Sequence, residues 1–221
     1  MTGTAPLFAP LGDSAITVRL GDGVSDLLSH EVFLATRRLA AARLDDVLEI
    51  VPAYAAFTVF YNSSAADYDD LRTRIADALA EPVGNDAGVA ESAPALVRIP
   101  VVYDGEDLDD VARRTGLSRD DVVGIHSSPE YRVHVIGFVP GFAYLGTLDE
   151  RLALPRKESP RNRVRPGSVA IADLQTAVYP SATPGGWNII GTTSLVLFNP
   201  SRQPPALLQA GDMVKFEPVI P

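Results

Sequence analysis

The first part of the chain switches between strand-like and helix-like spacing of its apolar side chains. Residues 15–20 alternate apolar and polar positions, which is typical of a half-buried strand, and strand-like runs recur at 47–51 and 56–61. Residues 26–43 and 67–80 instead place apolar side chains three or four positions apart, which predicts two amphipathic helices. The order strand, helix, strand, strand, helix predicts a small α+β domain of ferredoxin-like type.

A change in composition separates this region from the rest of the chain. Residues 81–94 contain Gly, Pro, Ala and acidic residues with no apolar period, as is usual for a connection between domains. We therefore predict a small α+β domain at residues 1–86, a linker at 87–94 and a second domain at 95–221.

The second domain begins with a strand-like run at 96–103, and two short helices follow at 108–126. A glycine suits the end of the first helix, and Ser118 with Asp121 forms a capping box for the second. From residue 131 onward, short runs rich in Val, Ile, Phe and Tyr alternate with Gly and Pro. This pattern predicts a mainly-β barrel or sandwich.

Composition and charge narrow the classes of function. The chain is 46% hydrophobic and 21% charged, which is ordinary for a soluble globular protein, and its formal net charge is −9. Nucleic acid or an anionic membrane is therefore not expected as the main partner, because phosphate binding needs a basic surface. The helical pair has the spacing of a DNA-binding motif, but Asp120 and Asp121 would face the phosphates. With no cysteine, no leader pattern and no long apolar run, we predict a cytoplasmic protein without disulfides.

The chain offers few residues for catalysis or metal binding. Its three histidines, His30, His126 and His134, are far apart and lack ligand-spaced partners, so we predict no metal site. We interpret His126 as capping the end of a helix, and His134 as a solvated or core-edge residue on a strand. No side chain stands out as a nucleophile or general base, so catalytic residues stay unassigned.

The stretch GFVPGFAYLG, residues 137–146, combines three aromatic rings with glycine and proline. Large rings usually occupy regular buried elements, whereas glycine and the Pro140–Gly141 pair mark bends. The stretch therefore either plugs a barrel core at a tight corner or places Phe138, Phe142 and Tyr144 along a ligand groove.

A cluster of basic residues at 151–168 stands out in this acidic protein. It is either a solvated loop that balances charge locally or a site for carboxylate or phosphate, since guanidinium groups bind both bidentately. Prolines stiffen the segment, which lowers the entropic cost of presenting its side chains. Under the second interpretation, Arg156, Arg161 and Arg163 are the candidate cations.

A third feature, YPSATPGGWNIIG at residues 179–191, contains the single tryptophan of the chain, Trp187. Pro184, Gly185 and Gly186 predict a tight turn before it. The tryptophan either anchors the barrel core or faces a ligand beside exposed N–H groups of the glycines. Because all three features lie in the same half of the chain, they favour one groove.

The series GFVPGFAYL, LPRKESPRNRVRPGSVAI, LQTAVYP and TPGGWNIIG resembles the family of 5-oxoprolinase B subunits. The same family is known as allophanate hydrolase subunit 1 and includes the kinase inhibitor KipI. The resemblance implies a cyclophilin-like β-barrel in the second domain. It also implies an obligate partner, the C subunit (similar to allophanate hydrolase subunit 2), in a hetero-oligomer such as a heterotetramer.

The resemblance carries an activity as well. Together with the C subunit and a separate A subunit, members of the family hydrolyse 5-oxo-L-proline to L-glutamate using ATP. The resemblance therefore implies ATP as the cofactor of the complex and a small anionic substrate.

Motifs and resemblance together predict a groove for substrate or partner, with no catalytic residue assigned. The chain would supply one half of a composite site that the C subunit completes. The predicted groove residues are Phe138, Pro140, Gly141, Phe142, Tyr144, Arg156, Arg161, Arg163, Gln175, Thr176, Tyr179, Pro184, Gly185, Gly186 and Trp187.

Two other functions stay open. A regulator of the KipI kind would bind a sensor histidine kinase, and a carboxyltransferase-type component would act in a urea carboxylase or allophanate pathway. The sequence also departs from the family pattern, with Ala172, Asp173 and Ala177 where glycine is usual and Thr192 where arginine is usual. Alanine or aspartate in place of glycine would narrow a groove floor or forbid a positive φ.

Overall fold

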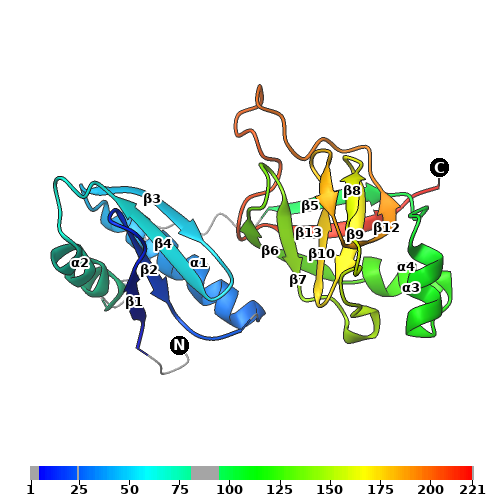
Figure 1. Cartoon of the computed structure of the whole chain (residues 1–221), viewed down its shortest axis with the longest axis horizontal. Coiled ribbons are helices and arrows are strands. Elements are labelled where there is room, and N and C mark those ends of the chain that lie inside the picture. Colours follow the sequence, from blue (N-terminus) through cyan, green and yellow to red (C-terminus); the bar gives the residue numbers. More distant parts are fainter. Residues whose placement is uncertain (1–4, 24, 81–94, 221) are drawn as a thin grey trace. The chain divides into compact units, whose positions relative to one another are not determined.

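The computed structural model describes residues 5–23, 25–80 and 95–220. The chain divides into two compact units, at 1–93 and 94–221 (Figure 1). The predicted linker lies outside the described residues, so the domain boundaries drawn from the sequence stay a prediction.

The first unit is a four-stranded antiparallel sheet with two helices. Its strands lie in the order β1-β2-β4-β3. The helices bury their apolar faces, so that Val32, Leu39, Leu71 and Ile75 share one core with the sheet. The elements are β1 (Leu7–Pro10), β2 (Ala15–Arg19), α1 (Asp26–Ala42), β3 (Val47–Pro52), β4 (Ala56–Tyr61) and α2 (Tyr68–Ala80).

Both helices of this unit begin at capping side chains. At the start of α1, Ser25 Oγ accepts a hydrogen bond of 3.2 Å from the Leu28 amide. Before α2, Asp67 Oδ1 accepts one of 2.9 Å from the Asp70 amide. These oxygens bind amide groups that have no partner within the helix. The two helices predicted from apolar spacing are confirmed.

The ferredoxin-like assignment of this unit is not confirmed. A β-α-β-β-α-β domain has its last strand after the second helix. In the described sheet the fourth strand is β1, which precedes the first helix and pairs with β2 from Leu7↔Arg19 to Pro10↔Ile16. The sequence does not predict β1, because its four residues, LFAP, are largely exposed and show no alternation.

The second unit is built on a seven-stranded sheet in the order β12-β9-β10-β7-β6-β13-β5, beside a two-stranded ribbon of β8 and β11. The main chain of Val102, after β5, exchanges hydrogen bonds of 2.9 and 2.8 Å with Thr192 at the end of β12. This bridge nearly closes the sheet into a barrel, which agrees with the mainly-β barrel predicted for this domain. The strands are β5 (Leu96–Val101), β6 (Glu130–Ile136), β7 (Ala143–Gly146), β8 (Arg161–Val164), β9 (Ser168–Ala172), β10 (Gln175–Val178), β11 (Thr183–Gly185), β12 (Asn188–Thr192) and β13 (Met213–Pro218).

Two helices, α3 (Leu108–Thr115) and α4 (Arg119–Ser127), lie together beside the sheet (Figure 1). The capping box is confirmed, because the Asp121 amide donates to Ser118 Oγ at 3.1 Å and the Ser118 amide donates back to Asp121 Oδ2 at 3.2 Å. Buried residues of both helices belong to the core of the barrel, which is a packing role rather than that of a DNA-binding motif. No helix in the described part of the chain has the length and apolar character needed to cross a bilayer.

Strand β9 links the core of the barrel to the region of the predicted groove. All of its residues are buried. Val169 and Ile171 belong to the main core, whereas Ala170 and Ala172 belong to a second cluster that contains aromatic rings. Because successive strand side chains point to opposite faces, this one strand supports both regions.

The interpretation of His126 as a helix cap is wrong, and so is the solvated alternative for His134. His126 does not cap a helix with its side chain, which is fully buried, with Nδ1 2.7 Å from the Tyr103 hydroxyl and Nε2 2.8 Å from Thr176 Oγ1. His134 is not solvated either, because it is buried and its ring lies against Gly146. The contacts that cover both rings come from other segments of the fold, Tyr103 and Thr176 for His126 and β7 for His134, so no local pattern predicts them.

Candidate functional site

The GFVPGFAYLG stretch forms the connection between β6 and β7, at residues 137–142, and then β7 itself. The Gly137 amide donates to the Phe142 carbonyl at 3.0 Å, and the Val139 amide donates to the Gly137 carbonyl at 2.8 Å. Phe138, inside this tight turn, has a φ of 68°, a value of the γ-turn that side chains rarely adopt. Its ring is 60% exposed. Backbone strain of this kind clusters at functional sites, so it supports the interpretation of this stretch as part of a groove.

The aromatic rings of the predicted groove gather around Phe142. Its ring centroid lies 5.4 Å from Phe138, 4.9 Å from Tyr144, 5.3 Å from Tyr179 and 5.8 Å from Trp187, each with an edge-to-face geometry. Such pairs stabilise one another beyond the area they bury. Phe142 is buried whereas Phe138 is exposed, so the cluster has a closed base and an open rim.

These rings line a cavity of about 260 Å³ within the second unit. This volume lies just below the range of roughly 300–1,000 Å³ that is usual for drug-sized ligands, so it suits a smaller molecule. The lining residues are Phe138, Phe142, Tyr144, Arg156, Lys157, Pro160, Tyr179, Pro184, Gly185, Gly186 and Trp187.

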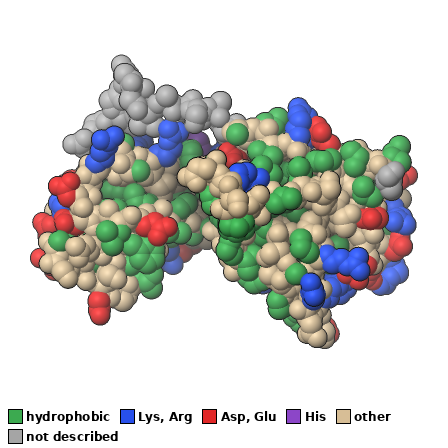
Figure 2. Space-filling model, turned by 90° about the horizontal axis from the view of Figure 1, so that it is seen from above, with side chains coloured by type: hydrophobic (Ala, Val, Ile, Leu, Met, Phe, Trp, Pro, Cys, Tyr) green, Lys and Arg blue, Asp and Glu red, His purple; other side chains and the backbone are tan. Residues whose placement is uncertain are grey.

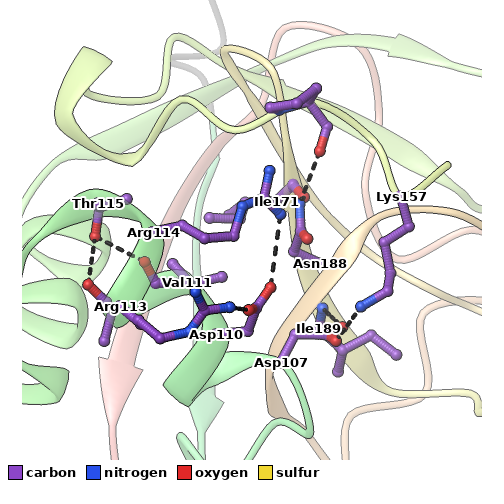
Figure 3. Close-up of polar contacts among 12 residues, drawn as sticks. Asp107, Asp110, Val111, Arg113, Arg114, Thr115, Lys157, Ile171, Asn188 and Ile189 are labelled. Atoms are coloured by element: carbon purple, nitrogen blue, oxygen red, sulfur yellow. Dashed lines mark hydrogen bonds and ion pairs between the residues drawn. The ribbon is translucent and has the colours of Figure 1, made fainter.

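The two charged residues of this lining, Arg156 and Lys157, have different surroundings. The guanidinium carbon of Arg156 lies 5.8 Å from the centroid of the Trp187 ring, in a cation–π arrangement. Lys157 points instead to Asp107, with its Nζ 2.6 Å from Oδ1 (Figure 3). On the face shown in Figure 2, basic side chains likewise lie beside acidic ones at several places.

Asp107 is a buried carboxylate that joins three segments of the chain. Besides Lys157, it accepts hydrogen bonds of 2.7 Å from Arg161 Nη2 and from the Ile189 amide. Burial alone would raise the pKa of Asp107, but the hydrogen bonds from Lys157, Arg161 and Ile189 outweigh burial and hold its pKa below the usual value. The carboxylate is therefore ionised at neutral pH. Among the described residues, no group of three or more His, Cys, Asp or Glu could hold a metal ion.

Two tyrosines in the cavity stay protonated at neutral pH. Burial raises the pKa of Tyr144 and of Tyr179, and the nearby positive charge of Arg156 only partly offsets this effect. The Trp187 amide also hydrogen bonds to the Tyr179 hydroxyl. Both hydroxyls can donate hydrogen bonds to a ligand, and neither is suited to act as a base.

The three arginines predicted as substrate-binding cations separate in the structure. Arg156 lines the cavity. Arg161 is engaged by Asp107 and by Glu106, whose Oε1 lies 2.8 Å from its Nε. Arg163 is exposed on β8 and does not line the cavity. Charge alone does not show which side chains of one loop form ion pairs with carboxylates from other segments.

Four further residues that were predicted to line the groove lie outside the cavity. Thr176 is buried in the barrel interior, and its neighbour Gln175 does not line the cavity. Pro140 and Gly141 shape the turn that carries the rings. Gly141 has a φ of 79°, and a Cβ there would come within 2.7 Å of Phe198. The remaining predicted residues, Phe138, Phe142, Tyr144, Arg156, Tyr179, Pro184, Gly185, Gly186 and Trp187, meet in the cavity.

Sequence reasoning missed three residues of this region. Lys157 and Pro160 line the cavity and belong to the basic cluster that the sequence singled out, so the cluster could have supplied them. Asp107 stands 50 positions before Lys157 in an acidic run, and no local pattern distinguishes it from its neighbours.

The departures from the family pattern are accommodated locally. Asp173 has a φ of 49°, so the expectation that aspartate would forbid a positive φ is wrong, and aspartate is among the few side chains that tolerate it. Ala177 is buried opposite Ala170 of β9. The Thr192 hydroxyl donates to Asp104 at 2.9 Å, beside the bridge that closes the barrel.

Replacement of Gly185 by alanine is expected to disturb the cavity. A Cβ at this position would lie 2.3 Å from the Tyr179 hydroxyl oxygen, so the ring must leave its contact with Phe142. We expect Gly185→Ala to lower the free energy of unfolding by about 1–3 kcal/mol, measured by urea unfolding. The emission of Trp187 should shift at the same time.

Gly186→Ala is the matched control for this substitution. A Cβ at Gly186 would meet its nearest atom, the Lys157 carbonyl oxygen, at 3.5 Å, which is an ordinary contact. Equal stability of the two alanine variants would contradict the account of Gly185.

Comparisons with known proteins agree with this architecture. The family model described as "Carboxyltransferase domain, subdomain C and D" matches residues 6–208. The chain is 40% identical over 219 residues to the B subunit of 5-oxoprolinase from Bacillus subtilis (strain 168), covering 93% of this chain and 90% of that protein. It is 39% identical over 211 residues to the B subunit of 5-oxoprolinase from Escherichia coli O157:H7, covering 94% of each. The chain therefore belongs to the carboxyltransferase C and D subdomain family, and within it to the family of 5-oxoprolinase B subunits.

Solved structures share the fold. TTHA0988 superposes with a TM-score of 0.82 and 36% identity over 94% of this chain, which spans 40% of the TTHA0988 chain. PH0987 from Pyrococcus horikoshii gives a TM-score of 0.55 at 41% identity, covering 96% of this chain and 97% of that one. Urea carboxylase of Kluyveromyces lactis, at 18% identity and a TM-score of 0.72 over 97% of this chain and 22% of that chain, shows the fold alone. The names of the curated relatives agree with the first of the three predicted functions and favour neither alternative.

Proposed function

We propose that the chain is the B subunit of an ATP-dependent 5-oxoprolinase, a hydrolase complex that opens the lactam ring of 5-oxo-L-proline. The names of the curated relatives support the activity. We also propose that the aromatic cavity is this chain's share of the substrate site. One observation carries this second step: a small cavity lined by aromatic rings, with the exposed cation of Arg156 among them.

The chemistry of the cavity suits a compact ring with one carboxylate. The apolar part of a lactam ring can pack on the faces of Phe142 and Trp187, while its carboxylate pairs with the guanidinium of Arg156. The protonated hydroxyls of Tyr144 and Tyr179 can donate hydrogen bonds to the lactam carbonyl. In this arrangement the chain binds and orients the substrate and limits its contact with water.

The same cavity lacks groups that would break the amide bond. Its lining contains no His, Asp, Glu, Ser or Cys among the described residues, and the Lys157 ammonium is held by Asp107. Opening a lactam needs a nucleophile and an activated carbonyl. We therefore propose that the C subunit completes the site and that the A subunit belongs to the same complex, which we place in the cytoplasm.

In the proposed complex, ATP would activate the lactam by transferring its terminal phosphoryl group to the carbonyl oxygen with release of ADP, which would make the carbonyl carbon a better electrophile. The cavity does not suit a triphosphate, because such a group requires several cations and Lys157 is already paired. The Tyr179 hydroxyl also fills the space on the side-chain side of Gly185. We assign no step of ATP chemistry to the residues of this chain.

The proposed function is tested by co-expressing the chain with the A and C subunits and measuring glutamate release from 5-oxo-L-proline. We expect release that requires ATP and all three polypeptides, and that stops when this chain is omitted. Undiminished release by the A and C subunits alone would refute the proposal, as would absence of release from the complete, folded complex.

A further inference from the structure

Four charged residues beside the cavity form a group whose charges cancel, and a fifth charged residue, Arg156, stands outside this group. Lys157 and Arg161 are positive, Asp107 and Glu106 are negative, and the ion pairs between them measure 2.6 to 2.8 Å. In the described part of the chain, no ion pair includes Arg156, which stands over the Trp187 ring. The group and Arg156 together therefore present a net charge of one positive unit.

We propose that Asp107 is a positioning residue that neutralises Lys157 and holds Arg161 away from the cavity, so that ligands meet the charge of Arg156 alone. The site then selects a compact ligand with a single negative charge, such as a ring monocarboxylate, over a polyanion such as a nucleoside triphosphate. This inference rests on the proposed function only in taking the cavity as a ligand site.

Asp107 is connected to the lining of the cavity by a few hydrogen bonds. The backbone amide of Lys157, whose side chain Asp107 holds, donates to the Gly186 carbonyl at 2.7 Å. Arg161 Nη1 donates to the Trp187 carbonyl at 3.4 Å. The carboxylate also binds the Ile189 amide, two residues after Trp187. One buried side chain thus joins the basic loop to β12, the strand that begins directly after the tryptophan.

Because Asp107 is buried, its negative charge must be compensated by the cations around it. Its side chain is 5% exposed, whereas those of Lys157 and Arg161 are 30% and 20% exposed. A buried carboxylate is tolerated only when cations and hydrogen bonds compensate its lost hydration. If the carboxylate lost its charge, both cations would lack their buried counter-charge, and Lys157 already lines the cavity. A polyanion would then find more than one cation there.

Arg156 is exposed, but it lines the cavity and its charge also acts on the groups inside it. Its electrostatic effect is felt at the hydroxyls of both Tyr144 and Tyr179, where it opposes the effect of burial on their pKa. The lining contains no acidic residue that would cancel this field among the described residues. A single carboxylate placed between the guanidinium and the hydroxyls would therefore be well matched.

Fluorescence of Trp187 tests the proposal on the full chain, because it is the single tryptophan and lines the cavity. The probes are cyclopentanecarboxylate, 5-oxo-L-proline and inorganic triphosphate. For the wild-type chain we expect saturable changes with the ring carboxylates and binding at least about tenfold weaker for triphosphate. In Asp107→Asn, which keeps the shape and removes the charge, the ratio of affinities should move toward triphosphate by about tenfold or more.

A double variant separates charge from structure. Asp107→Asn combined with Lys157→Gln removes one negative and one positive charge, so the preference for a monoanion should return. If Asp107 were merely structural, the double variant would be at least as impaired as the single one. The double variant also decides the matter if the single variant does not fold. Arg163→Gln is the matched control, because it removes an exposed charge of the same segment and should leave the ratio unchanged.

The outcomes distinguish this inference from the proposed function. Wild-type binding of triphosphate as tight as that of the ring carboxylates, or an unchanged ratio in Asp107→Asn, would overturn the inference even if the complex hydrolyses 5-oxo-L-proline. Binding of cyclopentanecarboxylate without any binding of 5-oxo-L-proline would support charge selection while refuting the proposed substrate site. No response of Trp187 to any monoanion would overturn the inference.

Discussion

Replacement of Arg156 by alanine is expected to lower kcat/KM of the assembled complex for 5-oxo-L-proline by about a hundredfold, which corresponds to ~3 kcal/mol. The guanidinium is the cation of the cavity that no carboxylate engages among the described residues, so its loss leaves the substrate carboxylate without a partner. The loss should appear mainly in KM, because the interaction is present before and during the reaction. Glutamate release under steady-state conditions measures both constants.

Arg163→Ala is the control for this prediction. It removes the same type of side chain from an exposed position on β8 and should leave kcat/KM unchanged. Circular dichroism should show that both variants keep the fold, since neither arginine forms an ion pair in the described structure. Normal turnover by Arg156→Ala would remove the guanidinium from the substrate site.

Acidification is expected to destabilise the second unit through His126. The fully buried ring accepts a hydrogen bond from the Tyr103 hydroxyl at Nδ1 and donates one from Nε2 to Thr176, whose hydroxyl donates to the Ala170 carbonyl. This direction follows from the hydrogen bond of Thr176, because its single proton is already used. Protonation of Nδ1 would place two donors against each other in an apolar core.

Burial lowers the pKa of His126 to about 3, whereas an exposed histidine has a pKa of about 6.5. Because the unfolded chain takes up a proton more readily, the contribution of this histidine to stability is complete above pH 6.5 and decreases as the pH falls. Between pH 6.5 and pH 4 we expect a loss of about 3 kcal/mol in the free energy of unfolding, measured by urea denaturation.

His126→Gln isolates this effect from the titration of carboxylates such as Asp107. Glutamine can accept and donate a hydrogen bond but does not titrate, so the difference in stability between the two proteins should shrink as the pH falls. A constant difference from pH 7 to pH 4 would show that His126 does not control the acid response.

Much of the second unit was predictable because its signals are local. The capping box of Ser118 and Asp121 needs only its own turn of helix, and the short apolar runs after residue 131 become barrel strands. The three motifs predicted to share a groove do come together, with aromatic rings around Phe142 and a cavity beside these rings. Local sequence could not place β1, because a short exposed edge strand depends on its partner for its structure.

The sequence could not show which arginines face the cavity, because their directions depend on residues distant in sequence. Arg156, Arg161 and Arg163 look equivalent in a basic loop, yet Asp107 draws Arg161 inward while Arg163 stays in solvent. Thr176 likewise belongs to the same motif as the groove residues but points to His126. In both cases a buried partner from another segment decides the direction of the side chain, because an unpaired polar group in a core is costly.

From the sequence by itself came the helices, most of the strands, the barrel in the second half, the family and the rings that border the cavity. These depend on periodicity, turn residues and dense motifs, whose physical effects act over a few neighbouring residues. The tertiary structure alone decided which cation faces the cavity, which histidines are buried and that Asp107 anchors the basic loop. Those outcomes depend on burial and charge pairing between different segments of the chain, up to 50 positions apart for His126 with Thr176 and for Asp107 with Lys157. Contacts of this kind are made only when the chain folds, so no local pattern in the sequence shows them.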